Sequence, residues 1–248
     1  MRKEDIVLNT LVFLNDHKKG IKQTKMMEIC KELGINTVEI RREFFDNIDF
    51  DTKEVGSKAK ELSLKILYSV SQYMYINKEL QKDDMEKYFK EAKVIGSSQV
   101  KVVIGDYNSV NEEEVFYMNN LCKKYNMKLL VENDQSIENG KADKILAFVK
   151  EYKNLEGKIG VTFDVGNYIW QKENPLENAK KLAPYVEYIH LKDVNSMDNP
   201  STVYLSEGII DWKKIIEVLP KNLLTALEYP CGDDAKVRLE TEINKLIY

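Results

Sequence analysis

Four short apolar runs in the second half of the chain end on residues that can bind protons or metal ions. The runs LLVE, VTFD, YIHL and TALE carry, at or next to their last position, Glu132, Asp164, His190 and Glu228. A charged side chain at the end of a buried strand is costly unless a partner compensates it. Any one of these residues alone is most simply a helix cap, an ion-pair partner or a hydrogen-bonded histidine. Four of them at matching positions indicate one shared site.

A divalent cation is the simplest compensation for such a set. Three carboxylates and one imidazole packed together without a counter-charge would repel one another and shift each other's pKa values. Carboxylate oxygens with one nitrogen suit Mn²⁺ or Mg²⁺ best, with Co²⁺ and Zn²⁺ as further candidates. The residue types therefore predict one divalent metal ion bound by Glu132, Asp164, His190 and Glu228.

The elements that must position these residues follow a regular rhythm. Eight β-rich runs recur about 30 residues apart, the size of a βα unit, and segments with helical periodicity separate them. The runs are 6–13, 37–41, 64–70, 100–105, 128–132, 159–164, 186–191 and 223–228. This alternation predicts a parallel sheet closed into one (β/α)₈ TIM barrel domain over residues 1–248, with an open doubly wound sheet as the alternative. No G-x-G-x-x-G or P-loop motif is present.

Three helix starts are marked in the sequence. Asn111 and Glu114 have the spacing of a capping box, and Asn174 precedes Pro175 as an N-cap precedes the first helical residue. Asp211 stands before the run WKKIIEVL in the same way. Helices are expected to begin directly after these residues.

The alternation of side chains along a strand decides where the four runs point. Residues two apart share a face, so Leu130 faces in if Glu132 does, and Ala226 faces in if Glu228 does. In a barrel the inward residues at the carboxyl ends of the strands converge where TIM barrels place their active sites. The period therefore predicts that all four residues meet at one mouth of the barrel.

Composition and charge narrow the class of protein. The chain is 43% hydrophobic and 31% charged, and its net charge of −4 gives no electrostatic reason to expect nucleic acid. Cys30, Cys122 and Cys231 are widely spaced and predict no disulfide framework, which fits a cytoplasmic location. Asn9 and Asn15 interrupt the first apolar run, so a strand is expected there rather than a signal peptide. No apolar window of about 18 residues predicts a transmembrane helix.

The stretches LVENDQ, TFDVGN, YIHLKD and LEYP resemble strand-end motifs of the sugar isomerase/epimerase superfamily with xylose-isomerase-like TIM barrels. That group includes ketose 3-epimerases, hydroxypyruvate isomerases and inosose dehydratases, and the resemblance runs from residue 125 to 230. It implies that one divalent metal ion is bound by Glu132, Asp164, His190 and Glu228. It also implies that the two glutamates act as acid/base groups. Endonuclease IV shares this barrel but uses several histidines for zinc, whereas this chain has two histidines in all, which disfavours a nuclease.

The chemistry that such groups suit is proton abstraction next to a carbonyl. A metal chelated by the substrate carbonyl and a neighbouring hydroxyl acidifies the C–H bond between them, and a carboxylate removes the proton. If Glu132 and Glu228 flank a sugar, return of the proton to the opposite face is epimerisation and return to the adjacent carbon is isomerisation. The expected function is a metal-dependent isomerase or epimerase of a small sugar or sugar phosphate. The main alternative is a lyase of this fold, an inosose or dehydroshikimate dehydratase. An endonuclease IV-like phosphodiesterase and a barrel that binds without turnover are less favoured.

Five further residues are candidates for substrate contacts. Asn167 falls where some epimerase relatives carry a substrate-contacting histidine, so an amide would replace that group here. Lys192 has inward parity and is expected to bind a substrate oxygen or phosphate, with a solvated loop charge as the alternative. Glu39 and Arg41 end the second run with inward parity and either form an ion pair or line the pocket. Glu207 matches a glycine-bearing family segment, with a simple turn as the alternative. A homodimer is a further hypothesis, and neither nucleic acid nor a membrane is expected as a partner.

Overall fold

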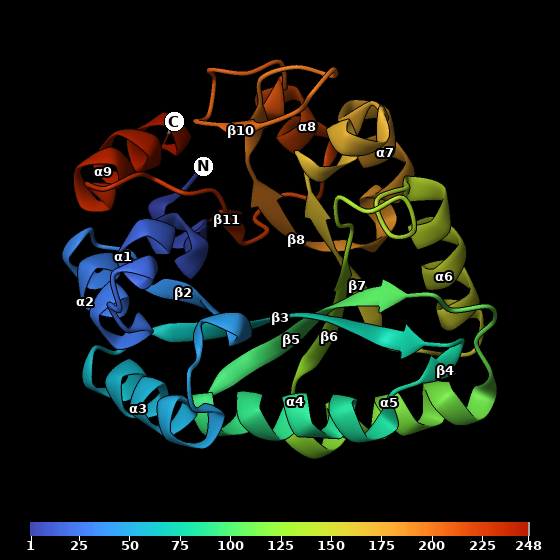
Figure 1. Ribbon diagram of the computed structural model, residues 1–248. Coiled ribbons are helices and arrows are strands. Elements are labelled where there is room, and N and C mark those ends of the chain that lie inside the picture. Colours follow the sequence, from blue (N-terminus) through green and yellow to red (C-terminus); the bar gives the residue numbers. More distant parts are fainter. Residues whose placement is uncertain (248) are drawn as a thin grey trace.

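Parallel strands form a closed barrel in the computed structural model, which describes residues 1–247 (Figure 1). In the described chain the eight barrel strands are β1 (Ile6–Asn9), β2 (Thr37–Arg41), β3 (Lys65–Ile76), β5 (Ser97–Gly105), β6 (Lys128–Glu132), β7 (Ile159–Asp164), β8 (Val186–Leu191) and β11 (Thr225–Leu227). Each of them pairs in parallel with two neighbours, and the pairing of β1 with β11 completes the ring. The expected TIM barrel is confirmed, and the open doubly wound sheet is wrong.

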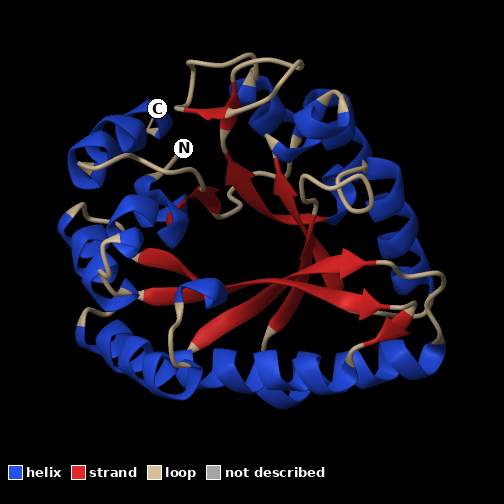
Figure 2. Ribbon diagram, in the orientation of Figure 1, coloured by secondary structure: helices blue, strands red, loops and turns tan. Residues whose placement is uncertain are grey.

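Helices cover the outside of this ring, as Figure 2 shows. In residues 1–247 they are α1 (Leu14–Lys18), α2 (Gln23–Glu32), α3 (Ile48–Glu61), α4 (Lys82–Ile95), α5 (Glu112–Tyr125), α6 (Ala142–Asn154), α7 (Pro175–Leu182), α8 (Trp212–Val218) and α9 (Ala235–Leu246). The three marked starts are confirmed. Asn111 and Glu114 form a complete capping box, Asn174 accepts from the backbone of Leu176, and Asp211 accepts from that of Lys214.

Several barrel strands have the bounds expected from the sequence. β2, β6, β7 and β8 have the predicted residues, and β11 lacks only the ends of its predicted run. β1 is shorter than predicted because the Asn9 side chain accepts a hydrogen bond of 2.9 Å from the Leu11 backbone. That contact caps a 3-10 helix over Thr10–Phe13 and ends the strand.

β3 is longer than predicted because it enters a hairpin. It pairs antiparallel with the short strand β4 (Glu79–Leu80). The two linking residues, Asn77 and Lys78, have φ values of 53° and 65°. Positive φ at both central positions is the requirement of a type I′ turn, whose twist suits a two-residue hairpin. The end of the third barrel strand therefore extends beyond the ring.

Two layers of side chains fill the barrel interior. The lower layer is an apolar cluster, and each member is followed two positions later by a polar residue. The cluster consists of Val7, Leu67, Leu130, Tyr188 and Ala226. The polar residues two positions on are Asn9, Ser69, Glu132, His190 and Glu228. Because residues two apart share a face, these five polar side chains lie one layer nearer the carboxyl end than the apolar floor.

Three further observations concern the described chain as a whole. Cys30, Cys122 and Cys231 are buried and free, as their spacing predicts. Among residues 1–247, no helix has both the length and the apolar character needed to cross a membrane. The large apolar core lies between the strands and the outer helices.

Candidate metal centre

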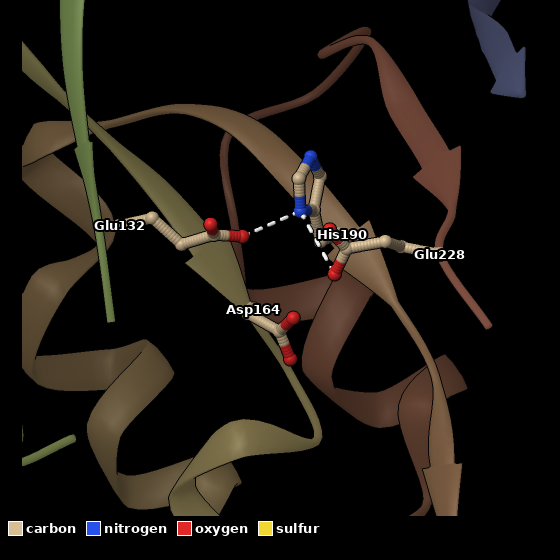
Figure 3. Close-up of side chains that lie close together, drawn as sticks. All are labelled: Glu132, Asp164, His190 and Glu228. Atoms are coloured by element: carbon tan, nitrogen blue, oxygen red, sulfur yellow. Dashed lines mark ion pairs between the residues drawn. The ribbon is translucent and has the colours of Figure 1, made fainter. Parts of the chain in front are cut away.

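The four residues predicted from the strand ends come together in the polar layer of the barrel. Each of Glu132, Asp164, His190 and Glu228 is buried and offers one ligand atom, and these atoms all lie within 4.8 Å of one another. Figure 3 shows the two glutamates approaching from opposite sides, with the imidazole and the aspartate between them. Three of the residues lie on β6, β7 and β8, and Glu228 directly follows β11.

The atoms that face one another at this centre are here called the inner atoms. They are Glu132 Oε1, Asp164 Oδ2, His190 Nδ1 and Glu228 Oε2. His190 Nδ1 lies 2.5 Å from Glu132 Oε1 and 3.3 Å from Glu228 Oε2. Glu132 Oε1, Asp164 Oδ2 and His190 Nδ1 are buried, and their close polar contacts within the described chain are with charged or titratable groups: Glu132 Oε1 with His190 Nδ1, and Asp164 Oδ2 with Lys192 Nζ. Buried carboxylate oxygens and an imidazole nitrogen that converge in this way fit a divalent cation.

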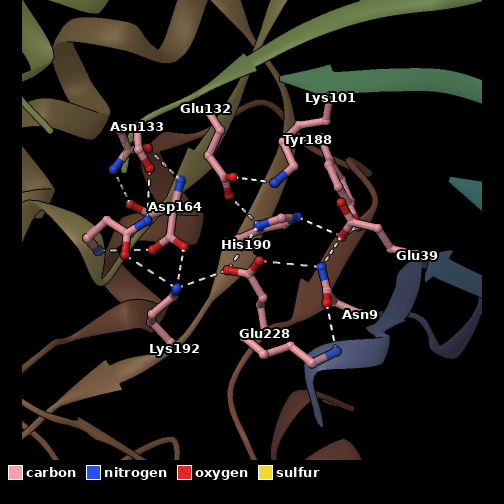
Figure 4. Close-up of polar contacts among 12 residues, drawn as sticks. Asn9, Glu39, Lys101, Glu132, Asn133, Asp164, Tyr188, His190, Lys192 and Glu228 are labelled. Atoms are coloured by element: carbon pink, nitrogen blue, oxygen red, sulfur yellow. Dashed lines mark hydrogen bonds and ion pairs between the residues drawn. The ribbon is translucent and has the colours of Figure 1, made fainter. Parts of the chain in front are cut away.

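The other oxygen of each carboxylate, here the outer oxygen, is held by the protein (Figure 4). Lys101, only 1% exposed, donates a short hydrogen bond to Glu132 Oε2. Arg41 Nη1 donates to Glu228 Oε1 at 2.7 Å. Asp164 Oδ1 accepts two backbone hydrogen bonds of 2.9 Å at the turn after β7. These contacts orient the carboxylates so that their inner oxygens face the centre.

Lys192 differs from the other cations because it contacts the inner oxygens. Its Nζ lies 2.8 Å from Asp164 Oδ2 and 2.9 Å from Glu228 Oε2. It also donates to Asn167 Oδ1 at 3.3 Å, and the side chain is almost completely buried. The alternative of a solvated loop charge is therefore wrong for Lys192.

Glu39 lies behind the imidazole rather than at the mouth. Its Oε2 is 2.8 Å from His190 Nε2 and accepts hydrogen bonds of 2.9 Å from both Asn9 Nδ2 and Tyr188 Oη. The carboxylate has no exposed surface, which does not support the expected contact with substrate. The suggested ion pair with Arg41 is also absent among the described residues, since the guanidinium pairs with Glu43 and Glu228.

Asn167 and Glu207 take different positions relative to the centre. Asn167 Oδ1 accepts from Gln135 as well as from Lys192, and its Nδ2 donates to the backbone of Asn133 at 2.8 Å. Its amide therefore borders the centre. The side chain of Glu207 is exposed, and within residues 1–247 it makes no side-chain contact with the cluster. The turn was the alternative for Glu207, and its backbone N–H indeed bonds to Tyr204 three residues before it.

Three contributors were not found from the sequence. Lys101 stands in the apolar run VKVVIG with inward parity, and a lysine inside such a run was the available signal. Asn9 is marked in the sequence only as an interruption of the first run, yet it bonds to both Glu39 and Glu228. Asn133 bonds through its side chain to both backbone groups of Asp164, at 3.0 and 2.9 Å, which fixes the end of β7.

Burial and neighbouring charges act in opposite directions on the cluster. Burial raises the pKa of Asp164 to about 7; Lys192 opposes this shift, and the two nearby glutamates add to it. Burial would also raise the pKa of Glu132, but Lys101 and His190 outweigh it and lower that pKa to about 2. Burial lowers the pKa of His190, and the surrounding carboxylates reverse this and hold it well above its usual range. The cluster thus retains protons that a metal ion would displace.

Several solved structures share this architecture. The probable 3-DHS dehydratase AsbF of Bacillus anthracis has a TM-score of 0.73 at 18% identity, covering 97% of this chain and 98% of that one. L-ribulose 3-epimerase gives 0.67 at 13% identity, covering 95% and 85%. The IOLI protein, solved with a zinc atom bound, gives 0.71 at 13% identity, covering 97% and 95%. At identities this low, the TM-scores establish a shared fold and nothing more.

Sequence comparison identifies the family directly. The uncharacterized protein YihM of Escherichia coli strain K12 is 23% identical over 199 residues, 75% of this chain. The alignment spans 57% of that curated relative's length. The model of the family described as xylose isomerase-like TIM barrel matches residues 27–244, most of the chain. The chain belongs to the xylose isomerase-like TIM barrel family and has a buried Glu–Asp–His–Glu cluster that could hold a metal ion.

Proposed function

We propose that this protein is a divalent-metal-dependent isomerase or epimerase of a small sugar or sugar phosphate. The observation that carries the proposal is the convergence of three carboxylates and one imidazole, all buried, whose ligand atoms lie within 4.8 Å of one another. Mn²⁺ and Mg²⁺ suit this oxygen-rich set, and zinc is bound by the structurally similar IOLI protein. When bound, the metal would act as a Lewis acid toward the substrate carbonyl.

Glu132 and Glu228 are the proposed acid/base pair. They lie on opposite sides of the centre, so a substrate placed between them presents a different face to each (Figure 3). Lys101 and Arg41 hold their outer oxygens, which keeps both carboxylates ionised and able to accept a proton. One glutamate takes the proton next to the carbonyl, and the other returns a proton to the opposite face or the adjacent carbon.

The remaining residues position and bind. Asp164 and His190 would hold the metal, and Glu39 fixes the imidazole by facing its Nε2 at 2.8 Å. Lys192 and Asn167 border the centre and are the proposed donors to substrate oxygens. Arg41 also donates to Ser71 and Glu43, and it is proposed to contact substrate from this position.

A lyase is the second candidate because the fold is shared with a probable 3-DHS dehydratase. The two reactions begin with the same proton abstraction and differ in the next step. Loss of a hydroxyl from the carbon next to the enediolate gives a dehydrated product, whereas reprotonation gives an isomer. Product analysis therefore separates the two candidates.

The test is a screen of ketoses, sugar phosphates and inososes with Mn²⁺ in D₂O, read by NMR. An isomerase or epimerase incorporates deuterium at carbon and redistributes isomers, and a dehydratase consumes substrate with a new enone or diketone absorbance. Glu240→Gln, on the exposed side of α9, is the matched control for Glu132→Gln and Glu228→Gln. Exchange that continues unchanged in either active-site variant would refute the proposed acid/base pair.

A further inference from the structure

We propose that Lys192 is an internal counter-ion of the centre, and that its ammonium leaves the inner oxygens when a divalent metal ion enters. This inference rests on the proposed metal-dependent function. It assigns to one lysine two successive partners, the carboxylates in the metal-free protein and a substrate oxygen in the metal-loaded protein.

The contacts of Lys192 are the first support. Its Nζ lies 2.8 Å from Asp164 Oδ2 and 2.9 Å from Glu228 Oε2, and both oxygens are inner atoms. Asp164 Oδ1 already accepts two backbone hydrogen bonds, so Oδ2 is the oxygen left to bind a metal. An ammonium and a divalent cation on the same two oxygens repel each other strongly in a buried site. The two cations therefore compete for these atoms.

The other cations around the centre do not have this conflict. Lys101 contacts the outer oxygen of Glu132, and Arg41 contacts the outer oxygen of Glu228. The ion pairs of Lys101 and Arg41 with these glutamates run to the outer oxygens, whereas those of Lys192 run to inner oxygens. Lys101 and Arg41 can stay in place when a metal binds, whereas Lys192 has to move.

Asn167 offers the Lys192 ammonium a further hydrogen-bond partner beside the inner oxygens. Nζ already donates to Asn167 Oδ1 at 3.3 Å, and that oxygen also accepts from Gln135 at 3.2 Å. Gly166 leaves space for the lysine stem, because a Cβ at this position would lie 2.2 Å from Lys192 Cγ. A small movement toward Asn167 keeps one hydrogen bond and frees the others for a substrate oxygen beside the centre.

Metal affinity of matched variants tests the exchange. Lys192→Met removes the competing ammonium, so the Kd for Mn²⁺ measured by titration calorimetry should fall by about tenfold or more. Lys101→Met also removes one buried positive charge next to the cluster, but from an outer oxygen, and is the control for the general effect of charge. The exchange is supported if the Kd for Mn²⁺ falls about tenfold further in Lys192→Met than in Lys101→Met. Equal tightening in both variants overturns it.

Chemical labelling of the unmodified protein gives an answer even if Lys192→Met does not fold without metal. Brief acetylation followed by peptide mass spectrometry should show slow labelling of Lys192 in chelator and faster labelling with Mn²⁺. Lys101 should be protected in both conditions. Unchanged protection of Lys192 in protein that demonstrably binds Mn²⁺ overturns the inference.

The outcomes separate this inference from the proposed function. If the natural chain binds no metal and Lys192→Met does, the competition is supported and the metal-dependent function is overturned. If neither protein binds metal, both fail.

Discussion

The Oε2 atom of Glu39 lies 2.8 Å from Nε2 of His190, while the Nδ1 atom of the same imidazole faces Glu132 and Glu228. The two nitrogens of this imidazole thus face different carboxylates: Nε2 faces Glu39 behind the centre, and Nδ1 faces two of the proposed metal ligands. Asn9 and Tyr188 bond to the Glu39 carboxylate and fix its position. A carboxylate on the far nitrogen of a metal-ligating histidine sets the ring orientation and increases its basicity.

Glu39→Gln should therefore weaken metal binding without removing a ligand. Loss of an outer partner of this kind typically costs about 10- to 100-fold in metal affinity. The Kd for Mn²⁺ from calorimetry is the measurement, and circular dichroism checks that the barrel is retained. An unchanged Kd would show that Glu39 has no part in orienting His190.

Glu132→Gln and Glu228→Gln should each abolish measurable turnover. An amide cannot take the proton, and a general base contributes about 100- to 10,000-fold to the rate. The glutamine carbonyl still accepts from Lys101 or Arg41, so the fold should remain intact. Deuterium incorporation at carbon, measured beside Glu240→Gln, gives the result for each residue separately. Near-normal exchange in either variant rules out the paired mechanism.

Removal of metal should lower thermal stability. A ligand present at about 100 times its Kd stabilises the folded state by about 2.7 kcal/mol. For a chain of this length that corresponds to a rise in Tm of about 5 to 10 °C. Melting curves in chelator and in Mn²⁺ measure the difference, and elemental analysis of unchelated protein identifies the ion. Protein with no divalent ion, and with a Tm that Mn²⁺ does not change, would exclude the site.

Metal affinity should rise with pH from about 5 to about 8, because binding must displace protons from the ligands. The pKa of Asp164 is raised to about 7, and that of His190 lies well above its usual range. In the metal-free protein Asp164 therefore holds its proton below about pH 7 and His190 holds one over the whole interval, and a metal ion binds only their deprotonated forms. Calorimetry in buffers of different ionisation enthalpy measures the protons released. A pH-independent Kd with no proton release contradicts this prediction.

Asn111→Ala should destabilise the protein by about 1 kcal/mol, because it removes an N-cap. Asn111 accepts from the backbone of Glu114 at 3.0 Å, and the Glu114 side chain accepts from the Asn111 backbone at 3.3 Å. Urea unfolding measures the change in the free energy of unfolding. Asn108→Ala, exposed and three residues earlier, is the control and should leave that free energy unchanged. Equal values for the two variants would mean that the capping box contributes no stability.

The sequence predicts the barrel and the four inner residues because both depend on local periodicity. A period of two along each strand decides which residues face in, and it does so without knowledge of distant partners. Glu132, Asp164, His190 and Glu228 were found in this way, and the structure brings them together.

The side-chain partners of residues on different strands could not be predicted in the same way. Glu39 and Arg41 share a face, as their spacing indicates, but the carboxylate bonds to His190 and the guanidinium to Glu228. Lys101 pairs with Glu132 on the neighbouring strand, and lysine is usually assigned to the surface unless its partner is known. Which side chains pair depends on the distances between strands of the closed barrel, and the sequence of one strand carries no information about those distances.

The loop after β8 shows a related limit. Glu207 precedes Gly208, a glycine in a segment that resembles the family, but the direction of the Glu207 side chain depends on how Asp193 holds the loop. The buried Asp193 carboxylate accepts from the backbones of Val194, Gly208 and Ile210, which draws the loop back against the barrel. Glu207 is left in solvent by that tie, which spacing alone does not reveal.

The apolar floor of the barrel has a consequence for how this chain can change over time. Val7, Leu67, Leu130, Tyr188 and Ala226 supply interior packing one layer below the reactive groups. Substitutions in the polar layer alter the reaction while the floor maintains the packing beneath it. A barrel divided in this way can acquire a new catalytic activity through substitutions at its mouth, while the apolar packing that stabilises the fold is unchanged.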